Sequence, residues 1–159
     1  MKHFLSHLPL QVRAICILLT LFMVPNIVHA DDVYLLTKQA INGATGNYNV
    51  PSNHQFTKTS ETVYTYTINT IPTGGTFSFR IGVKGWDNNM QPYNNDDALE
   101  INGSSYTISE NCYGKTKAWK VSYTDGEYSS LTITVDLSSS NRYVKITGVK
   151  SSAGGGQLH

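Results

Sequence analysis

The chain has 159 residues, of which 40% are hydrophobic and 14% charged, and its formal net charge is +1. A chain of this length has room for one domain with a sizeable core. It lacks the basic excess that is typical of proteins that bind nucleic acid or anionic membranes, so we expect neither kind of partner.

The first 30 residues are typical of a secretory signal peptide. Lys2 and Arg13 precede an apolar run that ends near Pro25 and is too short to span a bilayer, and Ala30 offers a small residue at the expected cleavage site. We therefore expect cleavage after Ala30, export to the periplasm or cell surface, and no membrane insertion. Loss of both basic residues changes the net charge of the mature chain to about −1.

Residues 33–37 begin a series of segments in which apolar and polar side chains alternate. A period of two, rich in threonine, valine, isoleucine and aromatic residues, is typical of half-buried β-strands. The clearest examples are 62–69 and 76–84. The other expected strands are 98–101, 105–109, 117–124, 130–137 and 142–149.

Glycine-containing turns separate these segments. Thr73-Gly-Gly, Asn102-Gly103 and Asp125-Gly126 supply the positive φ angles that tight hairpins require. About eight short strands without helical periodicity predict an all-β domain over residues 31–150. We expect an antiparallel β-sandwich, immunoglobulin-like or jelly-roll-like, with a closed barrel as the alternative.

Two segments inside the expected domain do not alternate. Residues 38–53 are rich in glycine, asparagine and alanine, and residues 82–97 are rich in asparagine and aspartate, so we expect long loops there. Residues 151–159 contain three consecutive glycines and are expected to form a flexible tail or a truncated linker.

The mature chain offers few groups for catalysis. Glu100 is the acidic residue most clearly inside an expected strand, and no second carboxylate is placed opposite it, as glycoside hydrolysis requires. His54 is the one mature imidazole outside the tail and is expected to be a loop residue. Cys112 is the single mature cysteine, so no internal disulfide is expected, and we interpret it as a small, semi-buried hydrophobic residue. We expect no enzyme activity.

The segment GVKGWDNNMQPYNNDD sets two large rings among short polar side chains. A sugar packs its apolar face on an aromatic ring, while its hydroxyls need polar partners, and Trp86 and Tyr93 supply such rings. The surrounding polar residues are Lys84, Asp87, Asn88, Asn89 and Gln91. The alternative is an ordinary long turn in which Trp86 caps the core. Trp119 alternates with Val121 and Tyr123 and is expected in the core.

The same segment is rich in oxygen ligands suited to calcium. They are Asp87, Asn89, Asn94, Asp96 and Asp97. Their order does not match the EF-hand loop, and the same residue types are common in turns. We therefore expect no cofactor, and keep a structural calcium ion as the less favoured alternative.

Three stretches resemble the starch-binding β-sandwich modules of bacterial surface glycan-utilisation proteins. They are Val33-Tyr34-Leu35-Leu36, Tyr64-Thr-Tyr, and Phe77-Ser-Phe-Arg-Ile-Gly-Val-Lys-Gly-Trp86, within residues 33–97. The chain departs from that pattern at Leu36-Thr37, which lacks a glycine, and at Gln91-Pro92-Tyr93, where the family has Tyr-Gly. The resemblance implies a non-catalytic module that binds an α-glucan or a related glycan.

The favoured hypothesis is therefore a secreted carbohydrate-binding module in which Trp86 and Tyr93 stack on sugar rings. In this hypothesis Asp87 orients the loop, and the residues that hydrogen-bond sugar hydroxyls are Lys84, Asn88, Asn89 and Gln91. The alternative is a secreted structural, adhesion or protein-interaction domain with no sugar ligand, whose partner at the cell surface would contact strand edges or aromatic patches.

Overall fold

The computed structural model describes residues 32–44, 54–83, 90, 97–108 and 117–152. Within these ranges the chain forms nine strands and no helix, so the predicted all-β class is confirmed. The described ranges accordingly contain no helix that could span a membrane.

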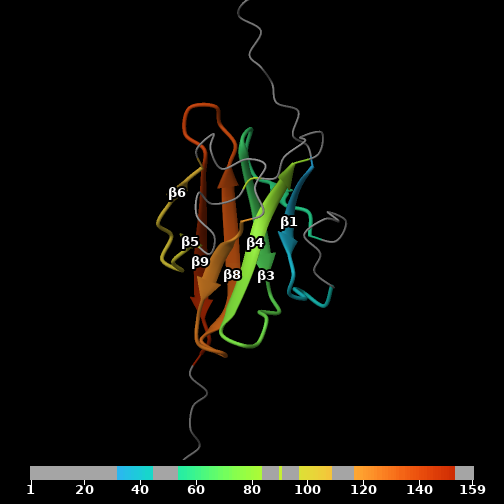
Figure 1. Cartoon of the computed structure of the whole chain (residues 1–159), viewed down its shortest axis with the longest axis vertical. Coiled ribbons are helices and arrows are strands. Elements are labelled where there is room, and N and C mark those ends of the chain that lie inside the picture. Colours follow the sequence, from blue (N-terminus) through green and yellow to red (C-terminus); the bar gives the residue numbers. More distant parts are fainter. Residues whose placement is uncertain (1–31, 45–53, 84–89, 91–96, 109–116, 153–159) are drawn as a thin grey trace, which may run out of the picture.

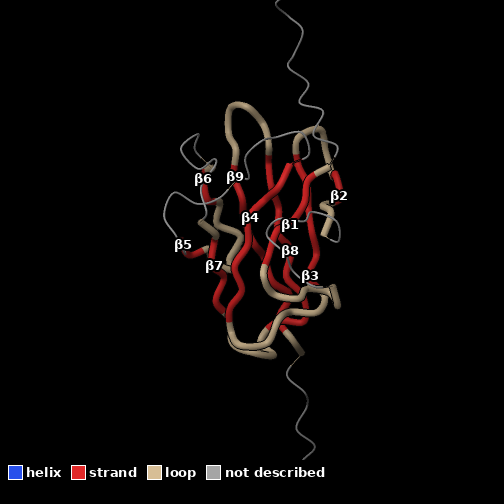
Figure 2. The backbone as a smooth tube through the Cα atoms, turned by 45° about the vertical axis from the view of Figure 1, so that its right-hand side comes forward, coloured by secondary structure: helices blue, strands red, loops and turns tan. Residues whose placement is uncertain are grey.

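The strands form two sheets that lie face to face (Figures 1 and 2). In chain order they are β1 (Val33–Thr37), β2 (Thr57–Lys58), β3 (Val63–Ile68), β4 (Thr76–Val83), β5 (Asp97–Ala98), β6 (Tyr106–Thr107), β7 (Trp119–Ser122), β8 (Tyr128–Asp136) and β9 (Tyr143–Lys150). One sheet has the order β1-β4-β7-β5 and the other the order β2-β3-β8-β9-β6. The predicted β-sandwich is thus confirmed. Each of the eight expected strands overlaps an observed one, although the expected strand 98–101 shares only Ala98 with β5, and β2 is the additional strand.

The core lies between the sheets and follows the predicted alternation. Its members include Phe77, Phe79 and Ile81 from β4, Leu131, Ile133 and Val135 from β8, and Tyr64, Ile68, Trp119, Val144 and Ile146 from the other strands. Trp119 is fully buried, as expected, and its ring centroid lies 5.5 Å from that of Phe79. Burial of these apolar faces is the main force that holds the two sheets together.

The three glycine turns connect one sheet to the other, so the prediction that they form tight hairpins is wrong. Gly74, Gly103 and Gly126 do adopt positive φ angles of 103°, 81° and 80°. However, β3 and β4, β5 and β6, and β7 and β8 lie in different sheets. A positive φ determines only the local path of the turn, whereas burial of both apolar faces determines the partner of each strand.

Both lateral sides of the sandwich are bridged by the chain. On one side, Leu35 N donates to His54 O at 2.8 Å and Phe56 N donates to Val33 O at 2.7 Å, after which β2 pairs with β3. On the other side, the Tyr106 hydroxyl of β6 donates to Asp97 Oδ2 of β5 at 2.7 Å. The outer backbone of β1 is therefore already hydrogen-bonded, and the other edge strands, β2, β5 and β6, have two residues each.

Candidate functional site

The residues predicted to bind a glycan lie outside the described residues. They are Lys84, Trp86, Asp87, Asn88, Asn89, Gln91 and Tyr93. Asn94 and Asp96 of the possible calcium set, and Cys112, lie outside them as well. The structure does place the residues that precede, interrupt and follow this segment.

Strand β4 sets the point where the segment begins. It ends at Val83, which is buried and pairs with Val33 of β1. Trp86 follows three residues later. The segment therefore starts at one end of the longest strand of the four-stranded sheet.

Met90 holds the middle of the segment. It is fully buried and forms an isolated bridge with Ile81, with hydrogen bonds of 2.8 and 3.0 Å between their backbones. Ile81 already pairs with Leu35 of β1 on its other side. Met90 therefore lies on the same side of β4 as β7. Strand β7 pairs with β4 from Thr76 to Phe79, and Met90 pairs with it further along, at Ile81. The sequence did not predict this buried position, because a single methionine among polar residues shows no strand periodicity.

Asp97 ends the segment beside the core. It begins β5, pairs in parallel with Trp119, and accepts the hydrogen bond from Tyr106 described above. The Tyr106 ring packs edge-on against Trp119, with ring centroids 5.9 Å apart. Among the described residues, no group of three or more His, Cys, Asp or Glu side chains could hold a metal ion.

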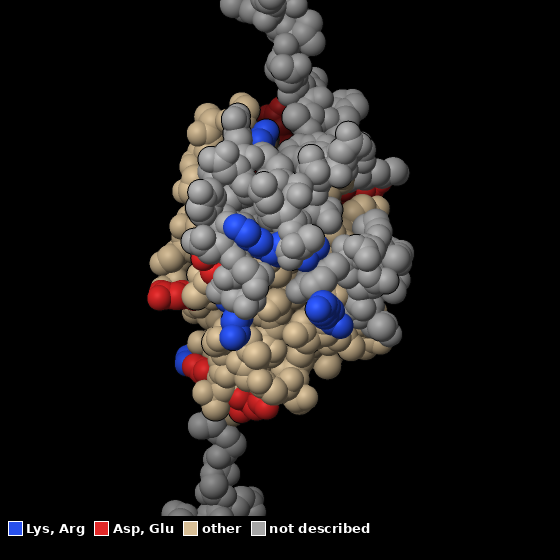
Figure 3. Space-filling model, viewed as in Figure 1, with Lys and Arg blue, Asp and Glu red and all other residues tan. Residues whose placement is uncertain are grey.

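Lys and Arg side chains gather on the face of the molecule that carries β1, β4 and β7 (Figure 3). Arg80 is on the outward side of β4, and its Nε donates to Lys117 O at 2.7 Å. Lys120 of β7 is exposed on the same sheet and pairs with Ser78 in register. These donors lie on the sheet from which residues 84–89 begin.

Glu100 lies in the turn that follows β5. The prediction that it lies in a strand is wrong, because β5 ends at Ala98. Glu100 is exposed in the following turn and accepts a 2.6 Å hydrogen bond from Asn102 Nδ2. Its carboxylate therefore belongs to the Asn102-Gly103 turn.

His54 lies in a loop, as predicted, and is also buried. Its Nδ1 lies 2.8 Å from the Tyr66 hydroxyl, which also accepts a hydrogen bond from Asn42 Nδ2 at 3.2 Å. Burial lowers the pKa of His54 and raises that of Tyr66, the latter effect being opposed by the Asn42 hydrogen bond. The imidazole thus contacts a phenol and has no carboxylate or thiol within hydrogen-bond distance among the described residues.

A groove of about 280 Å³ lies at the other end of the sandwich, and sequence reasoning missed it. Its lining residues are Asn69, Thr70, Ile71, Pro72, Thr73, Tyr123, Asp125, Gly126, Tyr128 and Ser129. The one available signal was the pair of tyrosines on either side of the Asp125-Gly126 turn.

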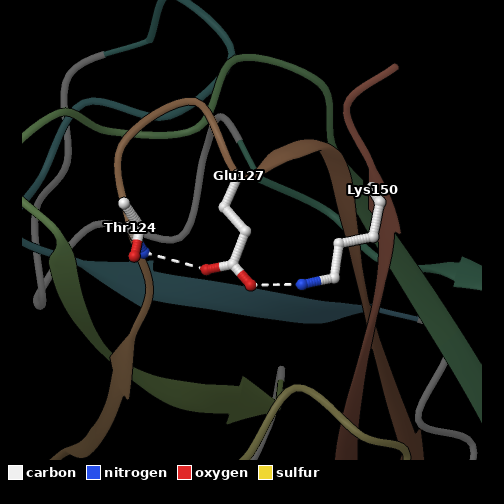
Figure 4. A network of polar contacts seen from close by, with 3 residues as sticks. All are labelled: Thr124, Glu127 and Lys150. Carbon is white, nitrogen blue, oxygen red and sulfur yellow. Dashed lines mark hydrogen bonds and ion pairs between the residues drawn. The ribbon is translucent and has the colours of Figure 1, made fainter. Parts of the chain in front are cut away.

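Glu127, which lies between the groove residues Gly126 and Tyr128, forms a network of polar contacts with Thr124 and Lys150 (Figure 4). Its carboxylate accepts a hydrogen bond from Thr124 N at 3.0 Å and pairs with Lys150 Nζ. The hydrogen bond from Lys150 is the main cause that lowers the pKa of Glu127. Ser151 N also donates to Glu127 O, so the end of β9 is joined to the turn between β7 and β8.

Comparison with solved structures finds a similar chain described as "Ligand induced structure of AmyP-SBD", a starch-binding domain. The TM-score is 0.48 and the sequence identity 12%, over 74% of this chain and 72% of that one. No protein-family model matches the chain, and no curated protein matches it in sequence.

Proposed function

We propose that the chain is a secreted, non-catalytic carbohydrate-binding module that recognises an α-glucan or a related glycan. Trp86 and Tyr93 stack on sugar rings, and Asp87 orients the loop. The residues that hydrogen-bond the sugar hydroxyls are Lys84, Asn88, Asn89 and Gln91. This proposal is based on the chain's own residues rather than on the similar structure.

The observation that carries the proposal is that Val83, Met90 and Asp97, which precede, interrupt and follow the candidate binding residues, are buried or half-buried and paired with core strands. Trp86 is three residues from Val83, and Tyr93 is three residues from Met90. Chain length alone therefore keeps the Cα atom of each of these two residues within about 11 Å of an anchored Cα atom. Anchoring of this kind lowers the entropy cost of binding, because the loop has less freedom to lose.

The described aromatic residues support the same assignment. None of the seven described tyrosines is more than partly exposed, and Trp119 is fully buried. Several of the phenol groups are engaged, as in Tyr123, whose hydroxyl donates to Pro72 O. A fully exposed stacking platform would therefore have to come from rings such as Trp86 and Tyr93.

The alternative of strand pairing with a protein partner has less support. Strand addition needs an open edge of several residues. The described edge strands β2, β5 and β6 have two residues each, and the outer edge of β1 is hydrogen-bonded to the segment around Gln55.

Isothermal titration and affinity electrophoresis of the mature chain with soluble starch, mannan and xylan test the proposal. We expect binding to at least one polymer, and a loss of about 2 kcal/mol, or roughly thirtyfold, for Trp86→Ala. Trp86→Phe, which keeps a ring, should lose less. Absence of binding to all three polymers, or unchanged affinity of Trp86→Ala, would overturn the proposal.

The non-catalytic character needs a separate measurement. Incubation of the mature chain with the bound polymer should release no new reducing ends. Release that Glu100→Gln abolishes would instead identify a hydrolase.

A further inference from the structure

The groove lies between two turns at the end of the sandwich where β4 begins, and β4 runs from there to the opposite end at Val83 (Figure 1). Strand β4 joins the two regions, because Thr76 follows the turn that lines the groove and Val83 precedes residues 84–89. Eight residues of extended strand place the two ends about 23 Å apart. The groove shares no lining residue with the loop proposed above.

The floor of the groove is built from partly exposed rings and apolar side chains. Tyr123 is held by the hydrogen bond of its hydroxyl to Pro72 O at 2.6 Å and by contact with Phe77, with ring centroids 6.2 Å apart. The Tyr128 ring packs so closely on Gly148 that a Cβ atom there would lie 2.3 Å from Tyr128 Cδ1. Both rings are thus held in place without a ligand.

The charged groups around the groove already have internal partners. The Asp125 carboxylate accepts hydrogen bonds from Gly74 N at 3.0 Å and Gly75 N at 2.8 Å. Lys150 pairs with Glu127, and its Nζ lies 4.7 Å from the Tyr128 ring centroid. A charged ligand would have to compete with these contacts, so the groove favours a neutral one.

The rim carries uncharged polar side chains. Asn69, Thr70, Thr73 and Ser129 are all exposed. Amides and hydroxyls above an apolar, aromatic floor match a molecule that has both a face of C–H groups and a ring of hydroxyls. The volume of about 280 Å³ lies near the lower limit of the range of about 300–1,000 Å³ that is usual for small-molecule sites, which suits one or two sugar rings.

We propose that this groove is a second glycan site, which takes a single sugar residue or the end of a chain. The ligand class rests on the proposed function, while the site has residues of its own. Two sites on one chain allow a polysaccharide to engage both. A polymer that engages both sites should then bind more tightly than a trisaccharide binds at either site alone.

The test is a ¹H–¹⁵N NMR titration of the mature chain with maltotriose, mannotriose and xylotriose, in the wild-type chain and in Trp86→Ala. We expect at least one trisaccharide to shift the amide signals of Gly74, Gly126 and Ser129 in both proteins. The double variant Asn69→Ala/Thr73→Val removes rim groups that are exposed, and should weaken this binding about three- to tenfold. Thr107→Val, an exposed threonine on β6, is the matched control and should leave it unchanged.

The outcomes separate the two proposals. Shifts confined to residues 84–97, with none in the groove, would overturn the second site and leave the proposed function in place. Groove shifts in a chain whose polymer binding is unaffected by Trp86→Ala would support the groove and overturn the assignment of Trp86. Equal groove affinity in the double variant, or no shift with any of the three sugars, would overturn the groove.

Discussion

His54 Nδ1 lies 2.8 Å from the Tyr66 hydroxyl, where residues 54–58 bridge the two sheets. The imidazole is 5% exposed, and its Nε2 has no hydrogen-bond partner in the described part of the chain. The ring is therefore accommodated in its neutral form, and burial lowers its pKa.

The fold should lose stability as the pH falls below the ordinary histidine value of 6.5. The unfolded chain binds a proton in that range more readily than the folded one, so the free energy of unfolding decreases from pH 6.5 down to the lowered pKa of the folded state. Urea unfolding midpoints measured above and below pH 6.5 test this. His54→Gln, which does not titrate, should lose the pH dependence in this window, and an unchanged slope in that variant would contradict the assignment.

Asn42→Ala should lower the free energy of unfolding by about 2 kcal/mol. The Asn42 side chain accepts hydrogen bonds from Asn69 N and Thr70 N at 2.7 and 2.9 Å, and donates to Thr67 O at 2.9 Å. Its φ angle of 51° is also unfavourable for alanine. Asn42→Gly keeps the backbone conformation and loses only the hydrogen bonds, so its thermal midpoint should lie between those of the wild type and Asn42→Ala. Equal stability of all three would show that these hydrogen bonds contribute nothing.

Gly148→Ala should cost about 1–3 kcal/mol, because the added methyl group would overlap the Tyr128 ring and Ile101 Cγ2. Chemical denaturation of Gly148→Ala, Tyr128→Ala and the double variant separates the contributions. Most of the cost should disappear in the Tyr128→Ala background, which gives a favourable coupling energy. Strict additivity would mean that the ring moves away at no cost.

Tyr106→Phe should lower stability by about 1–2 kcal/mol, because it removes the hydrogen bond to Asp97 and keeps the ring against Trp119. The loss should not add to that of Asp97→Asn in a double-mutant cycle of thermal unfolding. Since Asp97 is also the last anchor of residues 84–96, Tyr106→Phe should weaken polymer binding while leaving trisaccharide shifts in the groove unchanged. If neither Tyr106→Phe nor Asp97→Asn changes the affinity for the polymer, the anchor at Asp97 does not contribute to binding.

The period of two predicted the longer strands, such as β4 and β8, because alternate residues in each of them are buried. A strand of two residues such as β2 is too short to show a period. Residues 38–44 were expected to be loop, yet Ile41 is fully buried and Asn42 bonds to residues 25 to 28 positions away. Contacts of that separation leave no pattern in the local sequence.

The two candidate sites also differ in how far apart their residues lie in the sequence. The residues of the first lie within one short stretch, so their chemistry was apparent from the sequence. The groove combines turns whose members, such as Gly74 and Asp125, lie 51 positions apart, and only the crossing of the chain between the sheets brings them together. The error over the glycine turns has this same origin, since local backbone angles carry no information on which sheet receives the next strand.

The bridged sides of the sandwich affect how copies of the chain meet at high concentration. Neighbouring copies of the chain that meet along the described edges contact side chains or backbone groups that are already paired, rather than a long open strand. High local density should therefore leave each copy individually folded, because an intermolecular cross-β stack finds few described backbone groups on which to begin.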